Sequence, residues 1–397
     1  GGNNAGHTLV VEGRKLITHL VPSGCRYPGT QCVLGAGMVI DPEVFHGEIE
    51  ELRALGLLAR DELRVSLDAH VVFPYHRQID GLREDRAGAA ERIGTTRRGI
   101  GPAYEAKAAR RGVRVRDLLD ESTLRERLLK NKDALDFELS RLHDQDGALD
   151  VEALVELGRS WAQWLGPMAC DTGDLCHRAI VAGDKVLFEG AQGALLDLDH
   201  GTYPYVTSSS SIAGGVCTGI GIGPTLIDEV WGITKAYTTR VGRGPFPTRL
   251  GGPDGDRLRE AGSEYGATTG RPRDCGWLDL PALSRAARLS GMTGLCVTKL
   301  DVLAALPSVE ICESYEDGVD PGRDGLEHAV PRLRTVPGWG DPAILDGLRR
   351  AKGREELPGA VRAYLDLIEE HTGVPVVLVS VGPDRAQTLR FAEAFSP

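Results

Sequence analysis

The stretch that decides the fold is EGAQGALLDLDHGTYPYVTSSSSIAGGVCTGIGIGP, at residues 189–224. It holds eight glycines and shows neither the alternation typical of a strand nor the spacing typical of an amphipathic helix. Glycine is costly inside regular structure, so this density of glycine indicates backbone that must approach another group closely. A flexible linker is also rich in Gly and Ser, but it does not explain the DLDH run at 197–200 or the YPY run at 203–205. We therefore interpret residues 189–224 as a functional loop region.

Six further motifs accompany this region along the chain. They are GGNNAGHT at 1–8, GTTRRGIGPAYEAKAARRG at 94–112, TKAYTTRVGRGPFPT at 234–248, GATTGRPRDCGW at 266–277, TKLDVL at 298–303 and VGPDR at 381–385. In this order the set resembles the signature of the adenylosuccinate synthetase family, and the resemblance covers essentially the whole chain. It implies a P-loop-NTPase-related α/β fold with a large, mostly parallel β-sheet flanked by helices.

The resemblance also implies an activity and its partners. The family joins IMP and L-aspartate in a GTP-dependent ligation through 6-phosphoryl-IMP, which is the first committed step of AMP biosynthesis. Mg²⁺ is the implied cofactor and GTP the co-substrate, and the implied assembly is a homodimer in which Arg110 crosses into the neighbouring site. Because the chain begins with Gly inside a motif, we expect a fragment that lacks an N-terminal strand and the family's phosphate loop with its essential Asp and Lys. We expect residues 1–397 to form one large α/β domain.

Composition narrows the class of protein. With 397 residues, 41% hydrophobic and 26% charged, the chain is ordinary globular material, and its net charge of −11 argues against a general nucleic-acid binder. No apolar run is long enough to predict a membrane span. The eight cysteines form no C-x-x-C pair and no zinc-type spacing, so we expect incidental thiols in a reduced, cytoplasmic compartment.

Helices and strands are predicted from periodicity and caps. Asp41-Pro42 opens a helix with an apolar stripe at Phe45, Ile49, Leu52 and Leu55. Further helices are expected over 120–143, 148–166 and 359–371, and buried strands at Leu9–Val11, Lys185–Phe188, Val230–Ile233, Gly294–Val297 and Val376–Val379. Because motifs begin where these runs end, we expect one parallel sheet to present successive loops to one site.

The first motif suggests phosphate chemistry. Backbone N–H groups of such a glycine loop can hold phosphate oxygens, and His7 can donate a hydrogen bond as charge develops on a phosphate. By resemblance His7 is catalytic and Asn4 binds nucleotide phosphate, with Ala5, Gly6 and His7 at IMP. The resemblance further assigns Gly6, His7 and Thr8 to GTP and the Gly6 backbone to Mg²⁺.

Basic residues gather in two places. Residues 95–116 hold seven Lys or Arg against the single acid Glu105, and Lys235, Arg240, Arg243 and Arg249 follow without an intervening acid. Such patches fit small anionic ligands, and solvated surface is the alternative. The resemblance assigns Thr96 and Arg110 to IMP. Arg97 stands where the family usually has Gly, which predicts an altered loop backbone.

The opening stretch carries two more candidate ligands and one ambiguous cluster. Gln192 and Thr207 align with IMP-contacting residues, and the amide of Gln192 can both donate to and accept from the purine N1/O6 edge, which makes it a second catalytic candidate. Asp197, Asp199 and His200 are spaced like metal ligands, but no fourth ligand is evident. We favour a role in organising the loop over metal binding.

The remaining motifs concern aspartate and GTP. Two Arg and several hydroxyls suit a dicarboxylate, and the resemblance places Ala267, Thr268, Thr269, Gly270, Arg271 and Arg273 at aspartate. It adds Arg271 to the IMP site and Arg273 to the GTP site. TKLD resembles the guanine-reading motif of GTP-binding proteins, because the Asp301 carboxylate can accept from guanine N1–H and the 2-amino group. The implied GTP set is completed by Lys299, Leu300, Asp301, Ser380, Val381 and Gly382.

Three departures from the family pattern leave other functions open. They are Arg97, the Ser210-Ser211-Ile212 run in place of Asn-Thr-Thr, and Arg249 in place of a usual Glu. One alternative is a related ligase that uses another purine nucleotide, such as dGMP. The other, which the expected lack of the phosphate loop motivates, is a catalytically inert nucleotide-binding paralogue.

Overall fold

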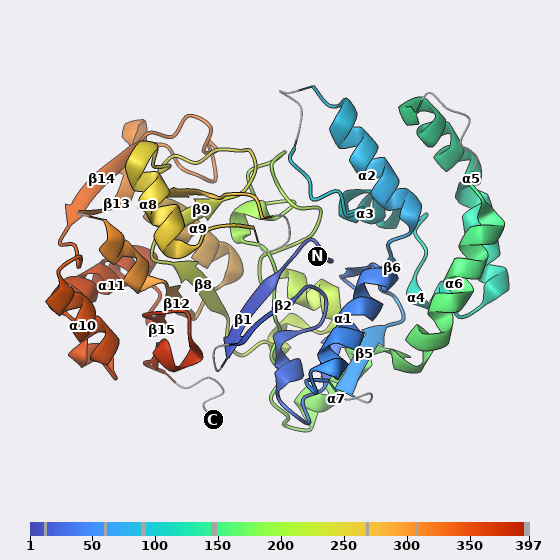
Figure 1. Ribbon diagram of the computed structural model, residues 1–397, viewed down its shortest axis with the longest axis horizontal. Helices are drawn as coiled ribbons and strands as arrows, with labels where there is room; N and C mark the ends of the chain where they lie inside the picture. Colours follow the sequence, from blue (N-terminus) through green and yellow to red (C-terminus); the bar gives the residue numbers. More distant parts are fainter. Residues whose placement is uncertain are drawn as a thin grey trace. The chain divides into compact units, whose positions relative to one another are not determined.

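The computed structural model describes residues 1–11, 14–58, 62–88, 93–143, 149–266, 270–306 and 308–392 (Figure 1). The chain packs into two compact units. Unit 1 comprises residues 1–9, 17–193 and 207–226, and unit 2 comprises residues 10–16, 194–206 and 227–397. The expectation of a single domain over 1–397 stays a prediction.

Unit 1 is built on short parallel strand pairs with helices around them. One sheet has the order β3 (Cys32–Leu34), β5 (Leu63–Ser66), β7 (Ala169–Cys170), and a second pairs β4 (Val39–Ile40) with β6 (His70–Val71). β1 (His7–Val11) and β2 (Arg14–Thr18) form a two-stranded sheet, of which residues 10–16 belong to unit 2. The helices are α1 (Pro42–Ala54), α2 (Pro74–Arg86), α3 (Ile100–Ala108), α4 (Val115–Leu118), α5 (Glu121–His143), α6 (Val151–Leu165) and α7 (Thr172–Val181).

The helix predictions in unit 1 are confirmed. Asp41 caps α1, since its Oδ1 accepts from the Val44 N–H at 3.3 Å, and Phe45 and Ile49 are fully buried. The predicted stripe is one residue too long, because Leu55 lies beyond the helix and is 53% exposed. α5 and α6 fall where periodicity placed helices, and they lie side by side.

The strand prediction at 185–188 is wrong. These residues are neither helix nor strand, and Leu187 is 75% exposed. A short apolar run forms a buried strand only if neighbouring strands and helices cover it, and here Leu187 is exposed while Val186 and Phe188 are only partly buried. The local sequence does not show which strands and helices will cover such a run.

Unit 2 contains the longer parallel sheet. Its order is β16 (Thr388–Arg390), β15 (Val376–Ser380), β12 (Gly294–Thr298), β8 (Trp231–Lys235), with β15, β12 and β8 parallel. The strands predicted near 230, 294 and 376 are therefore confirmed. The other strands are β9 (Thr238–Arg240), β10 (Asp274–Gly276), β11 (Leu278–Asp279), β13 (Val309–Tyr315) and β14 (Pro331–Val336). The helices are α8 (Gly252–Gly262), α9 (Leu280–Ser290), α10 (Pro342–Arg350) and α11 (Gly359–Thr372).

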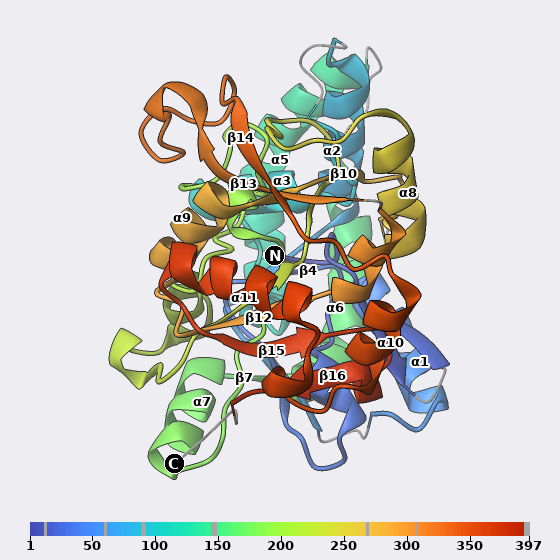
Figure 2. The ribbon, with the colours of Figure 1, turned by 90° about the vertical axis from the view of Figure 1, so that its left-hand side faces the viewer.

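One apolar core organises unit 2 and positions the strand ends. α11 lies over the parallel sheet, with Val361, Leu365 and Ile368 in the same buried cluster as Leu295 and Val379 (Figure 2). Burying side chains of this size stabilises the unit by about 1.5–3 kcal/mol each relative to exposure. Because β8, β12 and β15 are parallel, the loops that follow them leave the same edge of the sheet.

Candidate functional site

His7 stands at the start of β1 with its ring beside a carboxylate. His7 Nδ1 lies 3.1 Å from Glu189 Oε1, and the two side chains are 28% and 29% exposed. The hydrogen bond to Glu189 raises the pKa of His7, although burial opposes it. Ser23 holds Glu189 in turn, because its N–H and hydroxyl donate to Oε2 at 3.0 and 2.8 Å. The result is an oriented histidine in which the protonated form is favoured.

Glu189 is a functional residue that the sequence reasoning missed. The available signal was its position directly before GAQG, at the head of the decisive stretch. Nothing local revealed that it would meet His7, which is far away in the sequence.

Gln192 lies beside the first residue of the first motif. Its backbone is left-handed at φ 62°, and a Cβ added at Gly1 would lie 3.0 Å from Gln192 Oε1. That Oε1 is buried without a hydrogen-bond partner in the structure. Since buried polar atoms are rarely left unpaired, the amide points to a ligand. Nearby, Asn4 Oδ1 accepts from the Gly2 N–H at 3.2 Å, and Thr207 is half-buried in the same unit.

The basic segment 94–112 joins the N-terminal loop through an arginine that the sequence did not single out. Arg98 Nη1 donates to the Asn3 carbonyl at 2.9 Å, and burial lowers the pKa of its guanidinium. Thr96 is half-buried and Arg110 is exposed. Arg97 adopts φ 56°, a conformation that suits glycine, and the expectation that it alters the loop stays a prediction.

The DLDH run organises its own loop. Asp197 is 1% exposed, and its Oδ1 accepts from the N–H groups of Asp199 and His200 at 3.1 and 3.0 Å. Within the described ranges, no group of three or more His, Cys, Asp or Glu side chains is placed to hold a metal. The favoured reading of these residues as loop organisers is confirmed.

The TKLD loop after β12 presents an unpaired carboxylate. Asp301 Oδ1 is buried and has no hydrogen-bond partner in the structure, and burial raises the pKa of this carboxyl. The loop is tied to the next strand end, since the Lys299 N–H donates to Ser380 Oγ at 3.0 Å. Leu300 is buried beneath it, and Val381 and Gly382 continue from β15. The predicted set 299–301 and 380–382 therefore comes together.

The predicted aspartate segment is described in part. Ala267, Thr268 and Thr269 lie outside the described residues. Gly270 has φ 65°, and the Arg271 carbonyl accepts from the Gly266 N–H at 2.8 Å. Arg273 Nη1 donates to Glu264 Oε2 at 2.8 Å, and Lys299 Nζ lies 2.7 Å from Glu264 Oε1. Glu264 thus joins the predicted aspartate and GTP residues, and sequence reasoning did not identify it.

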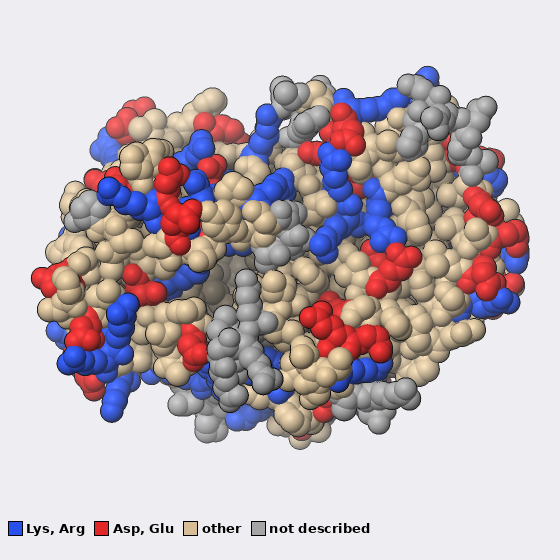
Figure 3. Space-filling model, in the orientation of Figure 1, with Lys and Arg blue, Asp and Glu red and all other residues tan. Residues whose placement is uncertain are grey.

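Neither basic patch is a free anion-binding surface as a whole. Arg240 donates to the Tyr205 carbonyl at 3.0 Å, and Arg249 pairs with Asp274 at 3.0 Å, which balances the charge reversal at position 249. On the face seen in Figure 3, Lys and Arg side chains lie among Asp and Glu side chains. Exposed pairs of this kind contribute little to stability.

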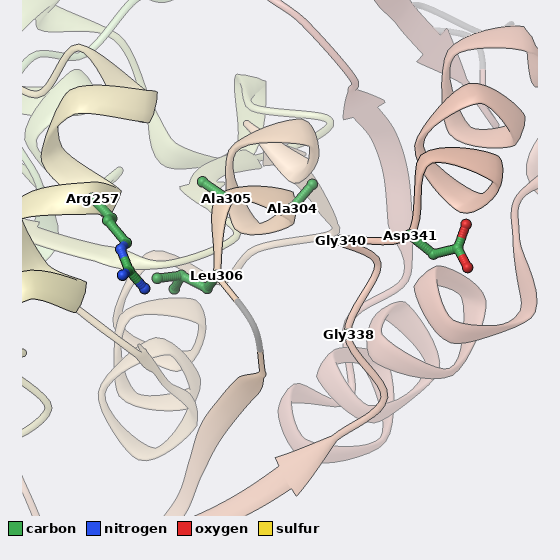
Figure 4. Close-up of a pocket in the computed structure, with 7 residues that line it drawn as sticks. All are labelled: Arg257, Ala304, Ala305, Leu306, Gly338, Gly340 and Asp341. Atoms are coloured by element: carbon green, nitrogen blue, oxygen red, sulfur yellow. The ribbon is translucent and has the colours of Figure 1, made fainter.

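A depression of about 430 Å³ lies beside the TKLD loop in unit 2 (Figure 4). None of the predicted site residues lines it. Its one cation, Arg257, pairs with Asp254, and Asp341 caps α10 through the Ala343 N–H at 2.7 Å. The residues that line it are Arg257, Ala304, Ala305, Leu306, Gly338, Gly340 and Asp341. The chemistry of the site lies elsewhere.

The absence of a carboxylate cluster in the described residues bears on the implied Mg²⁺. Magnesium in nucleotide sites is held largely by substrate phosphates and water with few protein oxygens. One backbone carbonyl, such as that of Gly6, fits such a site.

In this α/β fold, an aspartate with an unpaired buried oxygen follows a parallel strand, and a histidine beside a glycine loop is held by a glutamate. Such an arrangement is typical of an enzyme that uses nucleotides. The chain belongs to the adenylosuccinate synthetase family, whose family model matches residues 1–389. The expected fold class is confirmed by the likeness to the solved adenylosuccinate synthetase described below.

Individual relatives agree with this assignment. The adenylosuccinate synthetase of Desulforudis audaxviator is 53% identical over 100% of this chain and 91% of its own length. That of Moorella thermoacetica is 48% identical over 100% of this chain and 92% of its own length. The solved, fully ligated enzyme of Plasmodium falciparum is 35% identical with a TM-score of 0.88, covering 98% of this chain and 92% of that one.

A phage protein shares the fold alone. The succinoaminodeoxyadenylate synthetase of cyanophage S-2L, solved with dGMP and dATP, has a TM-score of 0.61 at 22% identity, covering 98% of this chain and 85% of that one.

No helix in the described part of the chain is long and apolar enough to cross a membrane.

Proposed function

We infer that the full-length protein ligates IMP and L-aspartate to adenylosuccinate at the expense of GTP. Family membership over residues 1–389 carries this conclusion. The alternatives are not favoured, because relatives at 48–53% identity are adenylosuccinate synthetases, whereas the phage protein is 22% identical.

The chemistry explains why a nucleotide triphosphate is needed. The C6 oxygen of IMP is a poor leaving group. Transfer of the γ-phosphoryl group of GTP to this oxygen forms 6-phosphoryl-IMP and GDP. The aspartate amine then attacks C6, the C6–O bond breaks, and phosphate leaves with the electron pair. Positioning and charge stabilisation carry most of the catalysis in such a transfer.

We propose the following roles in unit 1. His7, held by Glu189, donates a hydrogen bond to the phosphoryl oxygens as charge builds up on them. The unpaired Gln192 amide contacts the N1/O6 edge of IMP. Asn4 and Thr96 bind the IMP phosphate region, with Ala5, Gly6 and Thr207 beside the nucleotide.

In unit 2 we propose that Asp301 selects guanine. Its unpaired carboxylate oxygen can accept from guanine N1–H and the 2-amino group, whereas adenine presents an acceptor there. Lys299, Leu300, Ser380, Val381 and Gly382 complete the base site, and Thr8 adds to the GTP set from the first motif. Arg271 and Arg273 bind the aspartate carboxylates, with residues 267–270 beside them, and also reach the IMP and GTP sides respectively.

Two further features are part of this proposal. Mg²⁺, held by GTP phosphates with the Gly6 carbonyl, would neutralise phosphate charge when bound. The active unit is a homodimer in which the exposed Arg110 binds the IMP phosphate of the neighbouring site, and the protein works in the cytoplasm.

The test is product formation by the purified full-length protein with GTP and aspartate. Parallel assays with IMP and with dGMP should give adenylosuccinate from IMP and no ligation on dGMP. Activity on dGMP alone contradicts the inferred acceptor, and inactivity on both identifies an inert paralogue.

A further inference from the structure

Glu264 is a fully buried carboxylate in unit 2 that holds three cationic side chains. Its Oε2 lies 2.7 Å from Lys235 Nζ and 2.8 Å from Arg273 Nη1, and its Oε1 lies 2.7 Å from Lys299 Nζ. The Tyr237 hydroxyl donates to Oε1 at 2.6 Å. Hydrogen bonds of this kind, in which one or both partners are ionised, are about twice as strong as neutral ones.

The three cations come from separate parts of the chain. Lys235 ends β8, Lys299 opens the TKLD loop after β12, and Arg273 ends the GATTGRPR segment. Lys299 Nζ also donates to the Gly262 carbonyl at 2.6 Å, and the Arg273 N–H donates to the Glu264 carbonyl at 2.9 Å. Lys299, through its side chain, and Arg273, through its backbone N–H, therefore each donate to a main-chain carbonyl at or close to Glu264.

The Glu264 carboxylate supplies the negative charge that pairs with the three cationic side chains. Burial alone would raise the pKa of Glu264, but the charge and hydrogen bond of Lys235, together with the other donors, lower it to about 2. Glu264 is therefore ionised at any pH at which an enzyme works. Without it, three partly exposed cations would lie close together with no anion between them, and each would need a new position.

We propose that Glu264 is a positioning residue that fixes Lys299 of the guanine loop and Arg273 of the aspartate segment in one rigid cluster. It thereby sets the affinity for GTP and for aspartate together. The idea rests on the proposed function, because that function assigns Lys299 to GTP and Arg273 to both ligands. IMP depends mainly on unit 1 residues, so its binding should be affected least.

The experiment is Glu264→Gln in the full-length protein, which keeps the side-chain volume and removes the charge. We expect KM for GTP and KM for aspartate each to rise roughly 10-fold or more, as for a lost charge-assisted contact. KM for IMP should change by less than about 3-fold. An equal rise for all three substrates, or unchanged KM for GTP and aspartate, overturns the proposal.

Two further variants serve as controls for the Glu264→Gln experiment. Tyr237→Phe is the matched control, since it removes a hydrogen bond to the same carboxylate and leaves every cation in place, and it should shift each KM by less than about 3-fold. Glu264→Gln combined with Lys235→Met restores the net charge of the cluster, which keeps the test usable if the single variant does not fold. The double variant should still show the selective rise, because charge balance does not replace the missing anchor.

Calorimetric measurement of the affinities for GTP and for aspartate tests the role of Glu264 independently of the proposed function. If the wild-type protein fails to make adenylosuccinate, the proposed function fails first. The binding comparison between wild type and Glu264→Gln still decides the role of Glu264. Equal affinities in the two proteins would refute it.

Discussion

At the scale of single residues, the candidate site is marked by buried oxygens that have no hydrogen-bond partner and by a histidine whose pKa is raised. Gln192 and Asp301 each keep a buried oxygen without a hydrogen-bond partner, although such atoms usually cost about 1–3 kcal/mol. His7 is held by Glu189, which favours its charged form. Ligand binding would satisfy the first two groups and use the third.

Glu189→Gln should move the pH dependence of activity. Loss of the carboxylate lowers the pKa of His7, so the fall in rate as His7 loses its proton should begin at lower pH. The same raised pKa stabilises the folded protein below about pH 6.5, and this contribution disappears as the pH rises through the folded value. NMR titration of His7 and the pH–rate profile measure the shift. Ser23→Ala, which removes the hydroxyl that donates to Glu189, should shift the profile less. A profile that does not move in Glu189→Gln contradicts the role of Glu189.

Asp301→Asn should relax the choice of nucleotide base. An amide can present a donor to guanine, so the mutant loses a charge-assisted pair worth about 1.5–3 kcal/mol. GTP use should weaken roughly 10–150-fold, and discrimination against ATP should fall. Steady-state kinetics with both nucleotides test this. If KM for GTP does not change, TKLD serves only as a turn.

At the scale of elements, the functional loops depend on left-handed backbone at residues other than glycine. Arg97, Gln192 and Lys299 have φ of 56°, 62° and 62°. Such conformations cost about 1–3 kcal/mol and persist where surrounding contacts enforce them. Lys299 is enforced from both sides, by Ser380 on its N–H and by Glu264 on its ammonium group. The strand-end loop after β12 is thus held in this conformation at Lys299, a residue of the proposed GTP site.

Arg97 offers a clean measure of this cost. Arg97→Gly and Arg97→Ala both remove the exposed ion pair with Asp85, which contributes little. Only glycine accepts φ 56° without strain, so the Gly variant should be more stable than the Ala variant by about 1 kcal/mol. Chemical denaturation of the two proteins gives the difference. Equal stability would show that the loop relaxes at this position.

At the scale of the whole molecule, the proposed assembly is a homodimer whose sites share Arg110. Most of the residues proposed for IMP belong to unit 1, and those proposed for the guanine base and for aspartate belong to unit 2. Arg110 is exposed at the end of α3, where it is accessible to a second copy of the chain. The proposed assembly is therefore one in which a site needs a residue from two subunits.

Mixing Arg110→Leu with His7→Ala tests the shared site. Each homodimer should be nearly inactive at low IMP, because every site carries one lesion. In a heterodimer one site carries both lesions and the other carries neither, so up to half of the activity per heterodimer should return. Subunit exchange is verified by tagging the two variants differently. Exchange without recovered activity places Arg110 in its own subunit's site.

The sequence by itself determined several of the helices and strands and the family. Caps and apolar spacing located α1, α5, α6 and α11, because helix formation depends on residues a few positions apart. Ordered motifs identified the family, and the position of TKLD after an apolar run placed Asp301 at a strand end.

The tertiary structure alone decided which distant side chains meet. Glu264 reaches Lys235 and Lys299 across 29 and 35 residues, and Glu189 reaches His7. It also decided that Leu187 is exposed where an apolar run predicted a buried strand. The physical reason is that burial and pairing depend on the order of the strands and the packing of helices on them. Those arrangements are set by the energy of the whole core, and a single stretch of sequence holds only a small part of that energy.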